Sequence, residues 1–61
     1  MNLVLAITDD GRDKQVKCYL GGRLLPDFFS YGKDWPVADI ESDVGQRMHD
    51  KNYDFERTEV S

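Results

Sequence analysis

The sequence contains very little cysteine or histidine, the residues that hold many small proteins together. Cys18 is the one cysteine and His49 the one histidine among 61 residues. A single cysteine excludes an internal disulfide, and the two residues cannot supply the four ligands of a closed zinc site. A domain of this length buries only about 60% of the surface that its unfolded chain exposes. We therefore expect one small domain over residues 1–61, without metal or cofactor. We also expect it to gain stability by binding another chain, either a different protein or a second copy of itself.

Long apolar runs are also absent. No stretch approaches the ~18 apolar residues of a membrane-spanning helix, and the first residues lack the basic start and cleavage site of a signal peptide. The sequence therefore predicts a cytoplasmic protein that does not bind membranes.

Motifs for catalysis are missing too. There is no phosphate-binding glycine loop, no GxGxxG dinucleotide motif and no HExxH zinc motif. Cys18 alternates with the apolar positions of a strand, which indicates a small buried side chain and not a nucleophile. His49 lies near the end of a predicted helix, where the helix dipole favours a cation. We predict that the protein is not an enzyme.

Acidic charge is abundant, and it is unevenly distributed. Residues 34–61 carry eight acidic side chains against three basic ones, whereas residues 1–33 carry four against five. An acidic surface repels nucleic acid and membranes, but it attracts the basic groove of a protein that binds them. The expected partner is therefore a nucleic-acid-processing protein, with no direct binding to nucleic acid.

Period-two alternation predicts strands in the first third of the chain. Apolar residues alternate over 2–8 and again over 15–20, and the aspartates and glycine of residues 9–13 suit a tight turn between them. Gly21-Gly22 marks a second reversal, after which residues 23–25 can add a short strand that Pro26 stops.

The second half predicts a helix followed by a strand. Asp34 can cap a helix to about Lys51, and residues 53–60 have the content of a last strand. The apolar stripe of the helix consists of Val37, Ile40, Val44 and Met48. The predicted fold class is α+β, in the order β-β-α-β, with one helix across one face of a three-stranded antiparallel sheet.

Three aspartates gather on the polar side of the predicted helix. Asp39, Asp43 and Asp50 lie roughly 120–145° around the helix from its apolar stripe. The first two are ~6 Å apart along the axis, comparable with the spacing of phosphates along one DNA strand, so this ridge can mimic DNA. Charged residues opposite an apolar stripe are also typical of any solvated helix face, with Asp43 and Arg47 as an ordinary i,i+4 pair.

Residues 24–35 form an aromatic segment that we expect to be irregular, because Pro26 and Gly32 interrupt it. Six large apolar side chains in this stretch exceed what one helix on a small sheet can cover. They serve either as interface anchors or as the closing side of the core. The candidate binding residues of this segment are Phe28, Phe29, Tyr31 and Trp35.

Several short motifs follow one another in a suggestive order. Asp9-Asp10-Gly11 and Gly21-Gly22 flank a strand with lysine and tyrosine, and Leu25-Pro26-Asp27-Phe28 and Tyr31-Gly32 come after it. Over about residues 3–44 this order resembles the small acidic phage inhibitors of uracil-DNA glycosylase. In that family a phage-encoded dimer copies the charge and shape of DNA and holds an apolar residue of the enzyme in an aromatic box. The resemblance implies that Phe28 and Tyr31 line such a box.

A second resemblance concerns topology alone. Short phage inhibitors of bacterial RNA polymerase also run β-β-α-β and end in a strand similar to residues 53–56. Both resemblances predict a non-catalytic phage protein that blocks a host nucleic-acid enzyme in the host cytoplasm by covering its basic surface. Uracil-DNA glycosylase is the first expected target and RNA polymerase the second. A structural or adaptor subunit that binds through a sheet edge is the remaining alternative.

Overall fold

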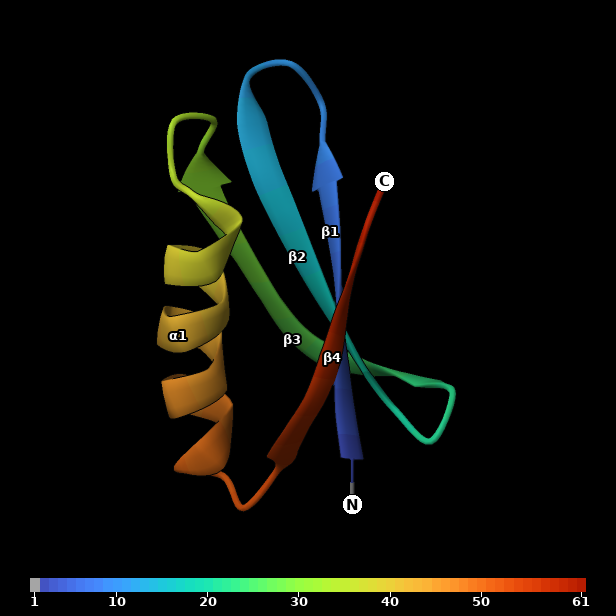
Figure 1. Cartoon of the computed structure of the whole chain (residues 1–61). Coiled ribbons are helices and arrows are strands. Elements are labelled where there is room, and N and C mark those ends of the chain that lie inside the picture. The colour runs from blue at the N-terminus through green and yellow to red at the C-terminus, as the bar shows by residue number, and fades with distance from the viewer. Residues whose placement is uncertain (1) are drawn as a thin grey trace.

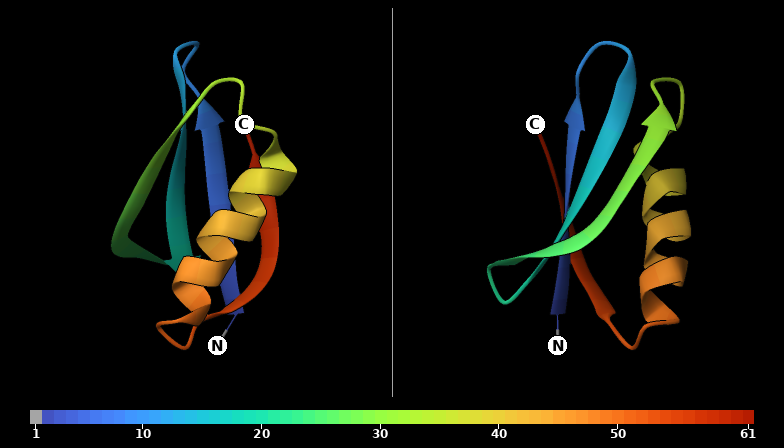
Figure 2. Two further views of the ribbon diagram at one scale, coloured as in Figure 1. Left: turned by 90° about the vertical axis from the view of Figure 1, so that its left-hand side faces the viewer. Right: turned by 180° about the vertical axis from the view of Figure 1, so that it is seen from behind.

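The computed structural model describes residues 2–61 as one sheet and one helix (Figure 1). The elements are β1 (Asn2–Asp9), β2 (Asp13–Leu20), β3 (Arg23–Gly32), α1 (Val37–His49) and β4 (Asp54–Val60). Strands β1 to β3 form an antiparallel meander, β4 pairs with β1 in parallel, and the strand order is β3-β2-β1-β4. The α+β class is confirmed, with α1 across one face of the sheet (Figure 2). The expected sheet of three antiparallel strands, with a possible extra short strand, differs in detail: the extra strand is β3, and the parallel pairing of β4 makes the four-stranded sheet mixed.

Strand β3 is the element that the sequence patterns underestimated. A strand of ten residues replaces the expected three, and it runs through Pro26. Pro26 lies between Leu24 and Phe28, where the pairing with β2 shifts register. Because β3 is an edge strand and is irregular at this point, the missing N–H of proline is tolerated. Residues 24–32 are therefore extended and not irregular as we expected.

Helix α1 begins later than its expected cap. Pro36 is the N-cap, with φ −63° and ψ 145°, and none of the side chains that the structure describes caps the helix. Asp34 lies outside it, in a turn closed by the Trp35 N–H, which donates to the Gly32 carbonyl at 3.0 Å. The residue before a proline is disfavoured in helical conformation, so Trp35 cannot begin the helix readily. After the helix, Asn52 adopts a left-handed conformation, with φ 68°, which asparagine tolerates better than most residues.

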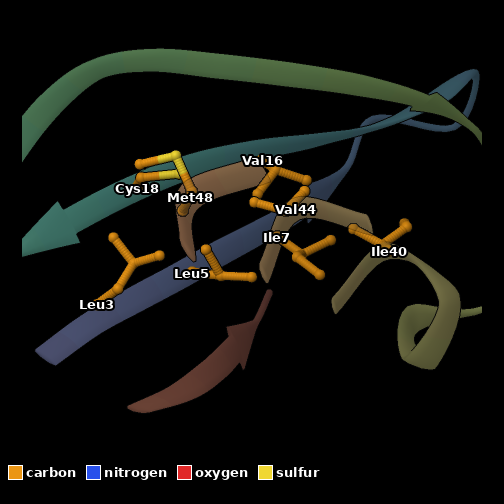
Figure 3. Close-up of a cluster of buried hydrophobic side chains, with 8 residues drawn as sticks. All are labelled: Leu3, Leu5, Ile7, Val16, Cys18, Ile40, Val44 and Met48. Carbon is orange, nitrogen blue, oxygen red and sulfur yellow. The ribbon is translucent and has the colours of Figure 1, made fainter. Parts of the chain in front are cut away.

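The core lies between the sheet and α1 (Figure 3). Its fully buried members come from β1, β2 and α1: Leu3, Leu5, Ile7, Val16, Cys18, Ile40, Val44 and Met48. The predicted alternation of β1 and β2 is confirmed, and so is the burial of most of the helical stripe. Burial, together with the charge of Asp27, raises the pKa of the Cys18 thiol to about 11, which removes its reactivity at neutral pH. In residues 2–61, no helix combines the length and apolar character needed to cross a membrane.

Candidate functional site

The predicted binding residues of β3 lie on two different faces of the sheet. Phe28 pairs with Lys17 in the register of β2 and β3, whereas Tyr31 pairs with Lys14. Facing residues of paired strands share a face, and successive residues alternate between faces. Phe28 therefore points away from α1 and is 53% exposed, while Tyr31 lies on the helix side and is half-buried. The two side chains do not line one box in this chain.

Phe29 closes the core from its open side. It pairs with Val16 on the helix side of the sheet and is half-buried against the core cluster. Leu25 and Tyr53 pack on the same cluster. This position gives Phe29 a structural role in the isolated chain.

Tyr31 and Trp35 form an aromatic pair where β3 leads into α1. Their ring centroids are 5.0 Å apart, with an interplanar angle of 57°. Trp35 remains 43% exposed, so the pair is anchored on one side and open on the other. Lys14 fixes the backbone below it, because its Nζ donates to the carbonyls of Lys33 and Trp35, the latter at 3.0 Å. The exposed indole is thus held in place by Tyr31 of β3 and by Lys14 of β2.

Asp43 joins this aromatic pair to the helix. The Tyr31 hydroxyl donates to Oδ2 of Asp43 at 2.6 Å, and Nε of Arg47 donates to the same oxygen at 3.2 Å. These two donors, the tyrosine first, hold the pKa of the Asp43 carboxyl below its usual range. Burial and the hydrogen bond to Asp43 raise the pKa of Tyr31 to about 12. At neutral pH the carboxylate is charged and the phenol keeps its proton.

A shallow hollow of about 360 Å³ opens beside the indole. It is lined by Asp34, Trp35, Pro36 and Asp39. Both aspartates are exposed, and neither forms an ion pair with any of the described residues. An aromatic face with carboxylates at its rim suits an arginine or lysine side chain, which stacks on the ring and pairs with the acid. We call residues 31, 34, 35, 39 and 43 the aromatic–acidic corner.

The three aspartates of the predicted ridge are not equivalent. Asp39 belongs to the corner and is exposed, and Asp43 is half-buried and bonded to Tyr31. Asp50 follows the last turn of α1 and accepts a 3.4 Å hydrogen bond from Gln46. One of the three therefore serves the fold, while the other two remain exposed to a partner.

Asp34 is the corner residue that sequence reasoning missed, because we assigned it to the helix cap. The conformational restriction that Pro36 imposes on Trp35 was the available signal. It places the helix start at residue 37 and leaves Asp34 free in the preceding turn.

The sheet face opposite α1 is the second surface of interest. No helix or strand formed by residues 2–61 covers it (Figure 2). Apolar side chains from three strands lie on it, namely Val4, Ala6, Tyr19, Leu24 and Phe28. Two adjoining hollows of about 380 Å³ and 330 Å³ lie over β1, the Gly21-Gly22 turn and β4. This open face combines these apolar side chains with the charged Lys17, Arg57 and Glu59, so it differs in chemistry from the corner.

Within the part of the chain that the structure describes, no group of three or more His, Cys, Asp or Glu side chains is arranged to hold a metal ion. No family model, no curated protein and no solved structure matches the chain. The candidate site is therefore interpreted from its own geometry.

Proposed function

We propose that the protein is a non-catalytic binding module that blocks a nucleic-acid enzyme through the aromatic–acidic corner. The observation that carries this proposal is the exposed Trp35 indole between Asp34 and Asp39, in a hollow of about 360 Å³. A binding hot spot typically has an aromatic anchor of this kind on a fixed support. A basic side chain of the enzyme that normally contacts a phosphate occupies the hollow.

The fixed support reduces the entropy lost on binding. Tyr31 packs against the indole and bonds Asp43, and Lys14 bonds the backbone of Trp35. Ordering a loose side chain costs about 0.5–1.5 kcal/mol, which a preorganised indole largely avoids. The acidic surplus of residues 34–61 adds long-range attraction toward a basic surface and speeds association.

The first enzyme to test is a bacterial uracil-DNA glycosylase, and the setting that we propose is a phage-infected host cytoplasm. Bacterial RNA polymerase is the second candidate. It is kept because Phe28 and Tyr31 lie on opposite faces of β3, which separates the two residues of the aromatic box and weakens the reason for choosing the glycosylase. An adaptor subunit that binds through a sheet edge is a third candidate, supported by the two edge strands of the sheet.

Inhibition assays with both enzymes test the proposal. Trp35→Ala should weaken inhibition at least about tenfold, since hot-spot truncations cost 2 kcal/mol or more. Phe28→Ala is the matched control, because it removes an aromatic side chain of similar exposure from the opposite face of the sheet. Circular dichroism should show that both variants are folded.

Two results would reject the corner as the binding surface. One is unchanged inhibition by Trp35→Ala with loss of inhibition by Phe28→Ala, which would assign binding to the open face. The other is a shift of DNA in a gel at low salt, since a chain that binds DNA directly is not a mimic of it. If neither enzyme is inhibited, the proposed targets are wrong.

A further inference from the structure

The two edges of the sheet differ in how well they are protected. The β3 edge contains Pro26 and a register shift, which are two devices that discourage pairing with another strand. The β4 edge contains no proline, and a neighbouring strand pairs with only one of its sides. The left view of Figure 2 shows β4, in red, at the side of the sheet away from β3, in green. The unprotected edge is thus β4.

The backbone groups that β4 presents can be identified from one hydrogen bond. The Ser61 N–H donates to the Ile7 carbonyl at 2.9 Å, so residue 61 directs its N–H toward β1. Successive residues of a strand direct their N–H and C=O groups to opposite sides. The backbone N–H and C=O groups of residues 57 and 59 therefore also point toward β1. The same groups of Thr58 and Val60 point to the free side. A strand added at this edge must pair with those two residues.

Among the registers centred within residues 56–59, side-chain charge then favours one for a second copy of β4. In a two-fold antiparallel pair, the residue on the axis lies opposite itself. An axis at Glu56, Arg57 or Glu59 places like charges directly opposite, which is destabilising. An axis at Thr58 places Arg57 of each copy opposite Glu59 of the other. In this register the backbone N–H and C=O groups of the two Thr58 residues also bond each other. These are the groups that point outward from the free edge.

The charges needed for this register are already assembled within one chain. Nη2 of Arg57 lies 2.9 Å from Oε2 of Glu59, and Nε donates to the same oxygen at 3.2 Å. Both side chains are exposed and lie on the open face of the sheet, since Arg57 is in register with Val4 and Glu59 with Ala6. Two copies related by an axis at Thr58 would combine these pairs into a network of four alternating charges.

Thr58 itself provides an independent observation. Its Oγ1 is a buried side-chain oxygen with no hydrogen-bond partner among residues 2–61. The Thr58 side chain lies on the helix side of β4, in register with Leu5, where its own chain covers the hydroxyl. Buried polar atoms are nearly always bonded, so this hydroxyl lacks a partner that the described residues do not supply. In the register centred on Thr58 the two threonines lie side by side, and a rotation about χ1 lets their hydroxyls bond each other.

We propose that the protein forms a two-fold dimer in which β4 pairs antiparallel with β4 of a second copy, centred on Thr58. The product is a continuous sheet of two copies, with both helices on the same face. Within the aromatic–acidic corner, Tyr31 belongs to β3 at the opposite edge of the sheet, whereas Asp39 and Asp43 lie on α1, which contacts β4. This dimer does not depend on the proposed target, and each dimer carries two corners.

Sedimentation equilibrium of the whole chain tests the proposal. The wild-type protein should be a dimer, and Glu59→Arg should weaken the dimer at least about tenfold, because two pairs of like charges then face each other. The double variant Arg57→Glu/Glu59→Arg should restore the dimer, since exchanging both charges preserves their complementarity. Thermal unfolding of each variant separates loss of the dimer from loss of the fold.

A cysteine placed on the axis reports the register directly. Thr58→Cys should form an intermolecular disulfide on mild oxidation, because residues opposite each other in a hydrogen-bonded pair have Cα atoms about 5.5 Å apart, within the range of a disulfide. Thr8→Cys, on exposed β1 sequence away from this edge, is the control and should not cross-link. A monomeric wild-type protein would overturn the proposal and leave the β4 edge to another protein's strand. A dimer that Glu59→Arg does not weaken would place the interface elsewhere.

Discussion

The hydroxyl of Tyr31 bonds the carboxylate of Asp43 across 2.6 Å and thereby ties the end of β3 to the middle of α1. Tyr31 also supports the exposed indole of Trp35. A single contact therefore connects the stability of the β3–α1 junction with the position of the candidate anchor. Asp43, which the sequence places on an outward acidic ridge, is part of this junction.

Removing the Tyr31 hydroxyl should weaken the junction without changing its packing. We expect Tyr31→Phe to lower the free energy of unfolding by about 1.5 kcal/mol, the lower end of what a hydrogen bond to a charged group contributes, because both residues are partly exposed. Urea unfolding measures this change. Tyr19→Phe is the matched control, because no side-chain hydrogen bond joins Tyr19 to another described residue, and it should leave stability nearly unchanged. Equal losses in both variants would mean that the Tyr31–Asp43 bond adds nothing.

The same contact predicts a dependence of stability on acid. The pKa of Asp43 is lowered in the folded chain, mainly by Tyr31 and also by Arg47. A group of this kind stabilises the fold above its unfolded pKa of about 4 and loses that contribution as pH falls through its lower folded value. Between pH 6 and pH 2, the free energy of unfolding should therefore decrease less steeply for Asp43→Asn than for the wild type. Urea unfolding at several pH values measures this difference.

Asp10 offers a separate control for this pH dependence. Its pKa is also lowered, chiefly by the backbone N–H groups of Asp13 and Arg12 in the first hairpin turn. Asp10→Asn should also make the free energy of unfolding decrease less steeply at low pH, and this effect should be the same with or without Tyr31→Phe. If Tyr31→Phe removes none of the effect of Asp43→Asn, then Arg47 and not the tyrosine sets the pKa of Asp43.

The parts of the fold that depend on local patterns could be predicted. The alternation around Leu5 and Cys18 and the helical spacing of Ile40 and Val44 each report one buried face, and all four residues are buried. The pairing of β4 could not be predicted in the same way. With only two strands before the helix, the last strand would run antiparallel to β1. The third strand, which the sequence offered only as a short addition at residues 23–25, reverses that direction.

The candidate site was predictable in its residue types but not in its geometry. An exposed aromatic anchor was one of two expectations for Trp35, and the structure places its indole 43% exposed. The Tyr31–Asp43 bond joins residues twelve positions apart and depends on the helix starting at Val37 instead of Asp34. Likewise, the separation of Phe28 from Tyr31 follows from a long β3, which Pro26 hid from the sequence pattern.

Two glycines should respond in opposite directions to the same substitution. Gly22 has φ +80°, a conformation in which a Cβ costs roughly 1–2 kcal/mol, so Gly22→Ala should destabilise the fold. Gly45 lies within α1 and a Cβ there meets no atom within 4 Å, so Gly45→Ala should stabilise the fold by about 0.5–1 kcal/mol. Thermal unfolding measures both changes. Destabilisation by Gly45→Ala would mean that this part of α1 is more tightly packed than the structure indicates.

The last prediction concerns the carboxylates at the rim of the Trp35 hollow. Asp34 and Asp39 are exposed and form no ion pair with the described residues, so neutralising them should leave the thermal unfolding midpoint nearly unchanged. We expect the double variant Asp34→Asn/Asp39→Asn to bind the target more weakly, mainly through slower association. Its affinity should also depend less on salt, because two steering charges are gone. Stopped-flow association at several salt concentrations measures both effects.

The control for this variant should remove the same net charge elsewhere. Asp9→Asn/Asp54→Asn neutralises two exposed carboxylates at the ends of β1 and β4, outside the corner. If the corner itself binds a basic side chain, this control should slow association less than the corner variant and should leave the dissociation rate unchanged. Equal effects of the two variants would show that net charge alone attracts the partner, and they would remove the carboxylates of the corner from the binding site.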